Sequence, residues 1–208
     1  MTSKAIRDPV QDHLLTPQNS TFVIFDCQSA LVDSIGSMDR QLLVNNITAA
    51  ARAAVSFALP IVHSTVNMTN GASRLAIPQL RKILDRFPTY HRTTINPWED
   101  AEFSQSVDKI GREKLIMVGL WTEASLTFAA LDALTAGYEV YVVVGAVGGT
   151  SLVAHEMALR RVEQAGGRLI SLSQFLCELQ RDWGRKETLS AFINLLVESG
   201  GAAGMKFS

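Results

Sequence analysis

Short apolar runs alternate with helical patterns along the chain. Residues 21–25 (TFVIF) form a continuous, β-branched apolar run, which is typical of a strand that is covered on both faces. Similar runs predict further strands at residues 61–65, 115–118, 139–144 and 168–172. Residues 89–95 can supply another strand or an extended edge.

The segments between these runs carry apolar residues at helical spacing. Between residues 39 and 59, one face is formed by Leu43, Ile47 and Ala54, and Pro60 ends the pattern. We expect further helices at residues 74–87 (interrupted by Pro78), 99–110, 123–136 (ended by Gly137), 151–165, 174–180 and 186–199.

Strands that alternate with helices imply right-handed βαβ crossovers and a parallel sheet. The predicted fold class is therefore α/β, a three-layer α/β/α sandwich around a parallel sheet of about six strands. A chain of 208 residues is long enough for one sizeable domain and short for two. We expect a single domain over residues 1–208, with an N-terminal arm at residues 1–20, an Asn-Gly turn at residues 70–71, and a C-terminal helix and tail at residues 186–208.

Residues 114–138 join a strand to a helix through a sharp turn. The strand ends near Val118, the turn covers residues 119–122, and the helix begins at Glu123 with Ser125 in its first turn. Free backbone N–H groups and the helix dipole at such a junction favour a negatively charged ligand or a developing oxyanion. The core-facing side of this helix is expected to carry Leu126, Ala130, Leu131 and Leu134.

Two other segments should lie beside this turn, because ligands in such folds bind beyond the carboxyl ends of the strands. Asp26 follows the first strand directly, and a glycine-rich loop at residues 145–149 follows the fifth. From its position alone, Asp26 is either a catalytic acid or base, or a cap for the following turn.

Composition narrows the functional classes. The net charge is −1 and there is no Lys/Arg-rich run, so the sequence has no electrostatic footprint for nucleic acid or an anionic membrane. No apolar run approaches the roughly 20 residues of a membrane span, and the first residues lack the apolar core of a secretory signal. We expect a cytoplasmic protein. The apolar content of 47% favours some burial between subunits.

The sequence contains no recognisable metal or nucleotide motif. Its 2 cysteines, Cys27 and Cys177, cannot form an all-thiolate metal site, and its 4 histidines are scattered. Neither G-x-G-x-x-G after the first strand nor G-x-x-x-x-G-K-[ST] occurs. We therefore expect no metal and no cofactor, and we interpret both cysteines as packing residues.

With these elements placed, the chain resembles the isochorismatase-like (cysteine hydrolase) superfamily, closest to its YcaC-like branch. The matching segments cover most of residues 20–185 in the expected order. They are VIFDCQSALV (23–32), RTTINPWEDAEF (92–103), LIMVGLWTEASLTFAALDALTAGYEVYVV (115–143), GTSLVAHEMALRRVEQAGGRLIS (149–171) and CELQRDW (177–183).

The resemblance implies a site made of a carboxylate, a cation and a nucleophile. The family has Asp at the end of the first strand, Lys or Arg from the third, and Cys at the start of the central helix, which correspond here to Asp26, Arg92 and Ser125. It also implies a cis peptide bond between Leu120 and Trp121, which directs backbone N–H groups into the oxyanion site. Residues expected beside the substrate or oxyanion are Leu120, Trp121, Thr122, Glu123 and Asn96.

Ser125 departs from the family pattern, which has a cysteine there. A thiol needs only a carboxylate partner, whereas an alcohol normally needs a His or Lys base, and Arg92 stays protonated. Two functions follow. The first is a hydrolase for a small amide, ester or other carbonyl compound, with Ser125 as nucleophile. The second is a catalytically silent homologue that binds a small anion through Arg92 and the helix N-terminus.

The alternatives for the neighbouring side chains also remain open. Trp121 either narrows the pocket or packs at a subunit contact, and Glu123 either orders the turn or interacts with the helix dipole. His155 is interpreted as a structural helix residue. The resemblance further implies a homo-oligomer, with an octamer as one form, and it excludes zinc because the Asp-x-His motif of the zinc amidases is absent.

Overall fold

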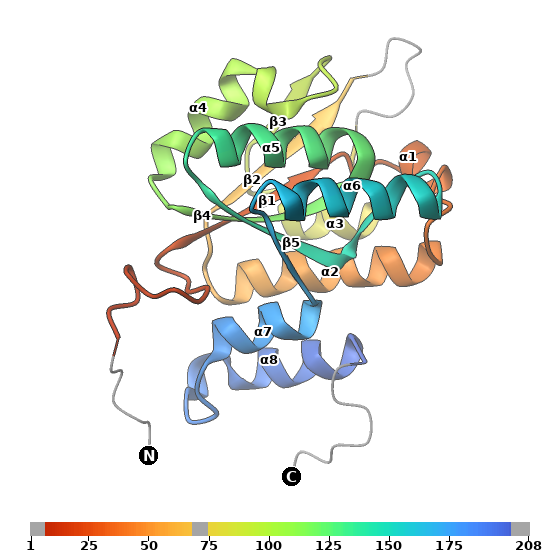
Figure 1. Ribbon diagram of the computed structural model, residues 1–208. Helices are drawn as coiled ribbons and strands as arrows, with labels where there is room; N and C mark the ends of the chain where they lie inside the picture. The colour runs from red at the N-terminus through yellow and green to blue at the C-terminus, as the bar shows by residue number, and fades with distance from the viewer. Residues whose placement is uncertain (1–6, 68–74, 201–208) are drawn as a thin grey trace.

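A parallel sheet forms the centre of the molecule (Figure 1). The computed structural model describes residues 7–67 and 75–200, and within them six strands pair in the order β3-β2-β1-β4-β5-β6. The strands are β1 (Ser20–Phe25), β2 (Ile61–Val66), β3 (Thr89–Arg92), β4 (Lys114–Leu120), β5 (Glu139–Gly148) and β6 (Arg168–Ile170). All pairs are parallel, so the predicted α/β fold is confirmed. The Asn70-Gly71 turn and residues 1–6 and 201–208 lie outside the described part of the chain.

Helices cover both faces of this sheet (Figure 1). They are α1 (Ser29–Asp33), α2 (Arg40–Ser56), α3 (Pro78–Leu84), η1 (Pro97–Glu99), α4 (Ala101–Ile110), η2 (Thr122–Leu126), α5 (Thr127–Thr135), α6 (Leu152–Gln164), α7 (Leu172–Gln180) and α8 (Lys186–Glu198). One core includes Leu43 of α2 and Phe175 of α7, and the other includes Phe103 of α4 and Val162 of α6. Among the described helices, none combines the length and apolar character of a membrane span.

The central strand β1 contributes to both cores. Phe22 and Ile24 face the core of α2 and α7, whereas Val23 and Phe25 face the core of α4 and α6. All four side chains are completely buried, and each contributes roughly 1.5–3 kcal/mol through the hydrophobic effect. Burial on both faces explains the continuous apolar run, and it also holds the register of the strand that delivers Asp26.

Polar side chains cap the first turn of α2 and of α6. The carboxylate of Asp39 accepts the N–H of Leu42 at 2.8 Å at the start of α2. Ser151 accepts the N–H of Ala154 at 3.1 Å at the start of α6. These side chains satisfy N–H groups that have no acceptor within the first helical turn.

Two predicted details are wrong. Pro78 starts α3 rather than interrupting a longer helix, because the first helical position needs no N–H group. The glycine-rich segment after Val144 is not a loop, because β5 continues to Gly148. A register shift between Met117 and Gly119 of β4 lets Gly148 pair with Leu120.

The core-facing side of α5 also differs from the prediction. Leu126 and Ala130 are buried as expected, but Leu131 and Leu134 are only partly buried. The buried positions of α5 are instead taken by Ala129 and Ala133, together with Ala130. The buried face of α5 is therefore made mostly of alanine rather than leucine, and such small side chains allow the helix to approach its neighbours closely.

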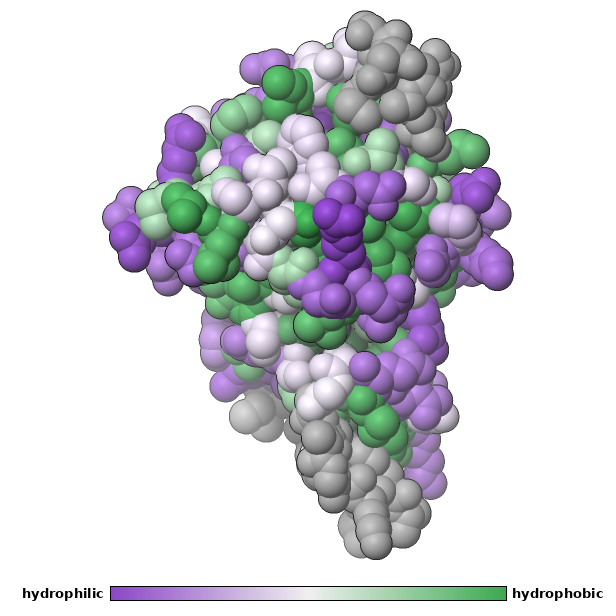
Figure 2. All heavy atoms as spheres, turned by 90° about the vertical axis from the view of Figure 1, so that its right-hand side faces the viewer, coloured by the Kyte–Doolittle hydropathy of each residue, from purple (hydrophilic) through white to green (hydrophobic). Residues whose placement is uncertain are grey.

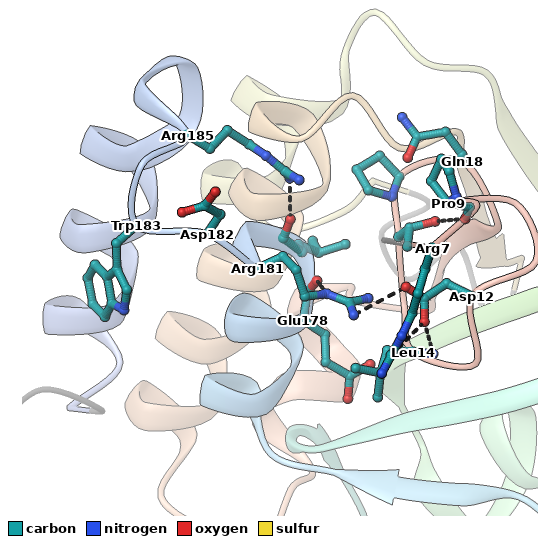
Figure 3. A pocket seen from close by; sticks show the side chains of 13 residues that line it. Arg7, Pro9, Asp12, Leu14, Gln18, Glu178, Arg181, Asp182, Trp183 and Arg185 are labelled. Carbon is teal, nitrogen blue, oxygen red and sulfur yellow. Dashed lines mark hydrogen bonds and ion pairs between the residues drawn. The ribbon is translucent and has the colours of Figure 1, made fainter. Parts of the chain in front are cut away.

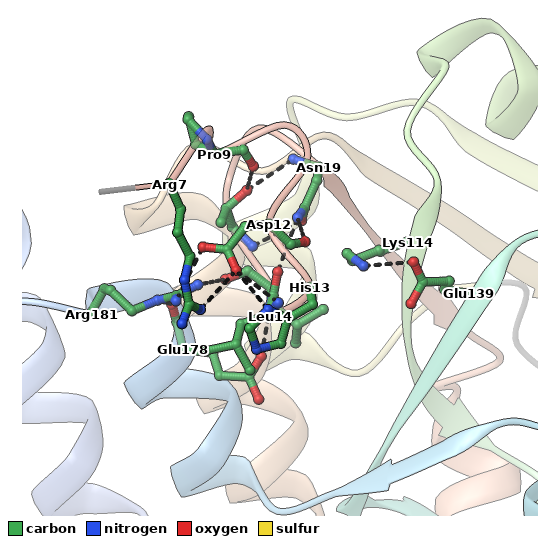
Figure 4. A network of polar contacts seen from close by, with 12 residues as sticks. Arg7, Pro9, Asp12, His13, Leu14, Asn19, Lys114, Glu139, Glu178 and Arg181 are labelled. Atoms are coloured by element: carbon green, nitrogen blue, oxygen red, sulfur yellow. Dashed lines mark hydrogen bonds and ion pairs between the residues drawn. The ribbon is translucent and has the colours of Figure 1, made fainter. Parts of the chain in front are cut away.

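The described part of the N-terminal arm, residues 7–19, is held at the amino edge of the sheet by a polar network around Asp12 (Figure 4). Asp12 lies 3.2 Å from Arg181 and 3.4 Å from Arg7, and it accepts the N–H of Leu14 at 3.0 Å. Burial by itself raises the pKa of Asp12, but the Leu14 N–H and the two guanidinium groups lower that pKa more, so the net shift is downward. The carboxylate therefore anchors the arm in its ionised form.

His63 of β2 is a buried histidine with an incomplete set of partners. Its Nδ1 lies 3.2 Å from the hydroxyl of Thr89, and its Nε2 has no partner among the described residues. Burial lowers the pKa of His63 from 6.5 to about 4, and the charge of His91 contributes in the same direction. The folded protein therefore holds this imidazole in its neutral form.

Because the unfolded chain binds a proton at His63 more readily, stability is fully present above pH 6.5 and is lost as the pH falls toward 4. We expect His63 to account for roughly 3 kcal/mol of the fall in unfolding free energy between pH 7 and pH 4. Urea unfolding at pH 7 and pH 4 should show that the unfolding free energy of His63→Leu falls by roughly 3 kcal/mol less than that of the wild type. The control His13→Gln changes a largely exposed side chain and should show the same pH dependence as the wild type. An unchanged pH dependence in His63→Leu contradicts the assignment.

Candidate functional site

Three residues from distant parts of the chain meet at the carboxyl edge of the sheet. Asp26 directly follows β1, Arg92 ends β3, and Ser125 lies in η2, which follows β4. The parallel register brings these elements together, because Phe25 pairs with Gly119 and Val66 pairs with Arg92. The structure therefore joins the three residues that the resemblance selected.

Asp26 is the centre of this cluster. Its Oδ1 accepts Arg92 Nη1 at 2.7 Å, and its Oδ2 accepts Arg92 Nη2 at 2.6 Å and the Ser125 hydroxyl at 2.6 Å. The residue has a left-handed φ of 52°, and its N–H donates to Ser64 O at 2.9 Å. Asp26 is 1% exposed, so both carboxylate oxygens obtain their hydrogen bonds from protein groups.

Arg92 is equally buried and binds the carboxylate in a bidentate manner. Nη1 also donates to Ser64 Oγ at 3.0 Å, and Nη2 donates to Ile95 O at 3.2 Å and to Ser125 Oγ at 3.0 Å. Its Nε has no hydrogen-bond partner in the described part of the chain. A guanidinium stays protonated at all relevant pH values, so Arg92 orients and neutralises Asp26 but cannot remove a proton.

Ser125 is presented by an irregular turn. The predicted helix from Glu123 starts instead as the single π turn of η2, and the regular helix α5 follows from Thr127. Trp121 O accepts the N–H groups of Ala124 and Leu126, both at 3.2 Å. The first N–H groups of such an element have no intrahelical acceptor, and they point toward its N-terminal end.

The strand that leads into this turn requires a glycine. Gly119 has a φ of 121°, and a Cβ atom there would lie 2.1 Å from Phe25 O. The following Leu120–Trp121 peptide bond is cis. The backbone of β4 therefore lies in very close contact with that of β1 immediately before the chain turns into η2.

The side chains predicted to border the oxyanion are used to support the turn. Leu120 is completely buried in the core. Trp121 is half-buried, and its Nε1 donates to Ser34 Oγ at 2.8 Å. The proximity of these two residues to a substrate or oxyanion stays a prediction.

The side chains of Glu123 and Asn96, which were also predicted to lie beside the substrate, make hydrogen bonds within the protein. Glu123 Oε1 accepts the N–H and the hydroxyl of Thr150 at 2.9 and 2.6 Å. Asn96 caps η1 by accepting the N–H of Trp98 at 3.0 Å, and its amide donates to Asp132 at 2.7 Å. Their contacts with a substrate stay a prediction.

Sequence reasoning missed Ser64 and assigned His155 only a structural role. Ser64 supports Arg92, and it could have been found as a polar residue on the same face of β2 as buried Val62. His155 Nδ1 lies 2.9 Å from Thr122 Oγ1 in a buried contact. No local pattern points to it, since the two residues are 33 positions apart.

The two cysteines differ in environment. Cys27 is buried as predicted, its Sγ contacts Phe25 O at 3.2 Å, and burial together with the charge of Asp26 raises the pKa of its thiol well above 9.0. Cys177 was expected in the core, but it is exposed, because α7 turns this position away from buried Phe175 and Leu176. Neither cysteine belongs to the cluster around Asp26.

A pocket of about 620 Å³ lies away from this cluster, between the N-terminal arm and the end of α7 (Figure 3). Asp12, Arg181 and Trp183 are among its lining residues. The arm precedes β1 and the triad follows the strands, so the two sites lie at opposite edges of the parallel sheet. In the described ranges, no group of three His, Cys, Asp or Glu side chains is arranged to hold a metal ion.

The structure is thus that of an α/β protein with a parallel sheet and a buried cluster of carboxylate, guanidinium and hydroxyl at its carboxyl edge. The isochorismatase domain matches residues 20–174, which is most of the chain, so the protein belongs to the isochorismatase family of hydrolases.

Individual relatives agree with this assignment. The chain is 29% identical to the probable hydrolase YcaC of Escherichia coli over 170 residues, which cover 81% of each protein. A crystal structure of YcaC from Pseudomonas aeruginosa, which contains hexane-2,5-diol and covalent acrylamide, superposes with a TM-score of 0.85 at 28% identity and covers 91% of this chain and 93% of that one. The crystal structure of E. coli YcaC, described as an octameric hydrolase of unknown specificity, superposes with a TM-score of 0.84 at 27% identity. The match covers 90% of this chain and 91% of that one.

The buried ion pair should dominate the stability of this region. Arg92→Met leaves Asp26 buried without its cation, so we expect it to lower the unfolding free energy by about 3–5 kcal/mol. The double variant Asp26→Leu/Arg92→Met should recover most of that loss, because no unpaired charge remains. Urea unfolding measures both effects.

Arg52→Met provides the control, because Arg52 pairs with Glu198 on the surface. This substitution should lower the unfolding free energy by less than about 1 kcal/mol. An Arg92→Met variant that is no less stable than Arg52→Met shows that the pair is not a stabilising element.

Proposed function

We propose that the protein is a hydrolase for a small amide, ester or other carbonyl compound, with Ser125 as the nucleophile. The observation that carries this proposal is the 2.6 Å hydrogen bond from the Ser125 hydroxyl to Asp26 Oδ2. A nucleophile that donates directly to a carboxylate has a path for its proton. Membership of a hydrolase family supports the reaction class.

The proposed reaction uses each member of the cluster. Ser125 Oγ attacks the carbonyl carbon while its proton passes to Asp26, and the carbonyl electron pair becomes an oxyanion. N–H groups at the start of η2 stabilise that oxyanion. Its collapse breaks the bond to the amine or alcohol, which leaves with the proton from Asp26. Water then cleaves the acyl ester on Ser125, and Asp26 transfers the proton of the water back to Ser125 Oγ.

Arg92 has an electrostatic role in this scheme. It holds the carboxylate in a fixed orientation, and its Nη2 lies 3.0 Å from Ser125 Oγ, where it stabilises developing negative charge. An alcohol is far less acidic than the thiol that the family uses, and the hydroxyl of Ser125 donates to a carboxylate rather than to a His or Lys base. We therefore propose that replacing Ser125 by cysteine creates a more reactive site than the wild-type site.

The second candidate is a silent homologue that binds a small anion in the same place. The low acidity of a hydroxyl at position 125 favours this candidate. The two Nη groups of Arg92 argue against it, because Asp26, Ser64 and Ile95 already accept their hydrogen bonds. A bound anion would have to depend on the backbone N–H groups of η2 and on Arg92 Nε, which is buried.

We also propose that the protein forms a homo-oligomer, and that an octamer is one candidate state. The octameric structure of E. coli YcaC supports this proposal. Exposed apolar side chains on α6 are compatible with such contacts, namely Leu152, Val153 and Met157.

The reaction is tested with the wild type, Ser125→Ala and Ser125→Cys on p-nitrophenyl acetate and a panel of small primary amides. We expect the wild type to hydrolyse at least one substrate, Ser125→Ala to lose at least about a hundredfold in kcat/KM, and Ser125→Cys to retain or exceed the wild-type rate. Circular dichroism of each variant controls for folding. Full activity in Ser125→Ala removes the nucleophile assignment, and inactivity of both wild type and Ser125→Cys favours the silent homologue.

Assembly is tested by size-exclusion chromatography with light scattering at several protein concentrations. We expect a mass that is a multiple of the 22.7 kDa chain. A purely monomeric protein at all concentrations contradicts the proposal.

A further inference from the structure

Side chains from other parts of the chain contact the turn that carries Ser125. The contacts of Trp121 and Glu123 are exposed to solvent, whereas the contact between Thr122 and His155 is buried. A buried hydrogen bond between polar groups matters more, because losing it leaves a desolvated group without a partner. Besides the bonds of Ser125 itself to Asp26 and Arg92, this pair is therefore a buried support of η2 from another element.

Thr122 is held on two sides. Its side chain contacts His155 Nδ1 at 2.9 Å, and its carbonyl accepts the hydroxyl of Thr127 at 2.5 Å. Thr122 is completely buried and is the first residue of η2, the five-residue turn that also contains Ser125. Any displacement of Thr122 is transmitted through this turn to the Ser125 hydroxyl and to the N–H groups beside it.

His155 is well placed to act as this support. It lies in α6, which packs against η2, and it is 9% exposed. Burial lowers the pKa of His155, although Glu123 and Glu156 act in the opposite direction. The neutral imidazole has one donor and one acceptor nitrogen, and either can pair with a hydroxyl.

We infer that His155 is a positioning residue for the site. Through Thr122, it fixes the orientation of η2, and η2 in turn places Ser125 Oγ within 2.6 Å of Asp26. The inference rests on the proposed function of Ser125, but it concerns the geometry of the turn rather than the outcome of hydrolysis.

The test uses a thiol in place of the hydroxyl. In the double variant Ser125→Cys/Cys177→Ser, the remaining native cysteine, Cys27, is buried and unreactive, so alkylation by iodoacetamide reports on position 125. Adding Thr122→Val removes the hydroxyl at nearly constant volume, whereas Thr122→Ser retains it. Adding His155→Ala removes the other partner. Urea unfolding of each variant shows how much global stability has changed.

We expect Thr122→Val and His155→Ala each to slow alkylation by roughly tenfold, and Thr122→Ser to stay within about twofold of its parent. The combined Thr122→Val/His155→Ala variant should be no slower than either single change, because the two residues act as one unit. In the wild-type background, the same changes should lower kcat with little effect on KM.

Equal alkylation rates in all these variants overturn the inference. It is also overturned if the parent thiol at position 125 reacts only after unfolding, because η2 then does not present this position. A wild type without hydrolase activity, combined with slower alkylation in Thr122→Val and His155→Ala, refutes the proposed function and leaves the positioning role standing.

Discussion

The site depends on the buried ion pair between Asp26 and Arg92. Moving two charges out of water costs several kcal/mol for each ion, and the cost is offset only when the pair has good geometry and further hydrogen bonds. The carboxylate is saturated by Arg92 and Ser125, and the guanidinium receives further acceptors from Ser64 and Ile95. The ends of β1, β2 and β3 and the turn η2 must therefore all be in place at once.

The same pair sets the chemistry that is available. Arg92 binds the carboxylate of Asp26 in a bidentate manner and fixes its orientation, and the other side-chain partner of this carboxylate is the hydroxyl of Ser125. In the proposed reaction this hydroxyl is the nucleophile, and Arg92 and the first N–H groups of η2 stabilise the developing negative charge.

Support for this arrangement comes from outside the strands. Three successive side chains at the start of the turn are contacted by Ser34 after α1, by His155 of α6 and by Thr150 between β5 and α6. Of these three contacts, only the one from His155 is buried. Residues that hold a turn in this way have no characteristic spacing, because their partners are set by how helices pack on a sheet. Sequence reasoning found the triad through a resemblance to a family. Only the alternation of side chains along β2 could have pointed to Ser64, and no local pattern points to the contact between His155 and Thr122.

The sequence by itself determined the order of the six strands and of the longer helices, the burial of β1 on both faces, and the position of Asp26 at a strand end. The reason is that hydrophobic periodicity is local and that parallel strands share one carboxyl edge. Only the tertiary structure decided that β5 continues to Gly148, that alanines line the core side of α5, and that Cys177 faces solvent. These features depend on strand register and on the closeness of packing between segments that are distant in the chain, which no local pattern encodes.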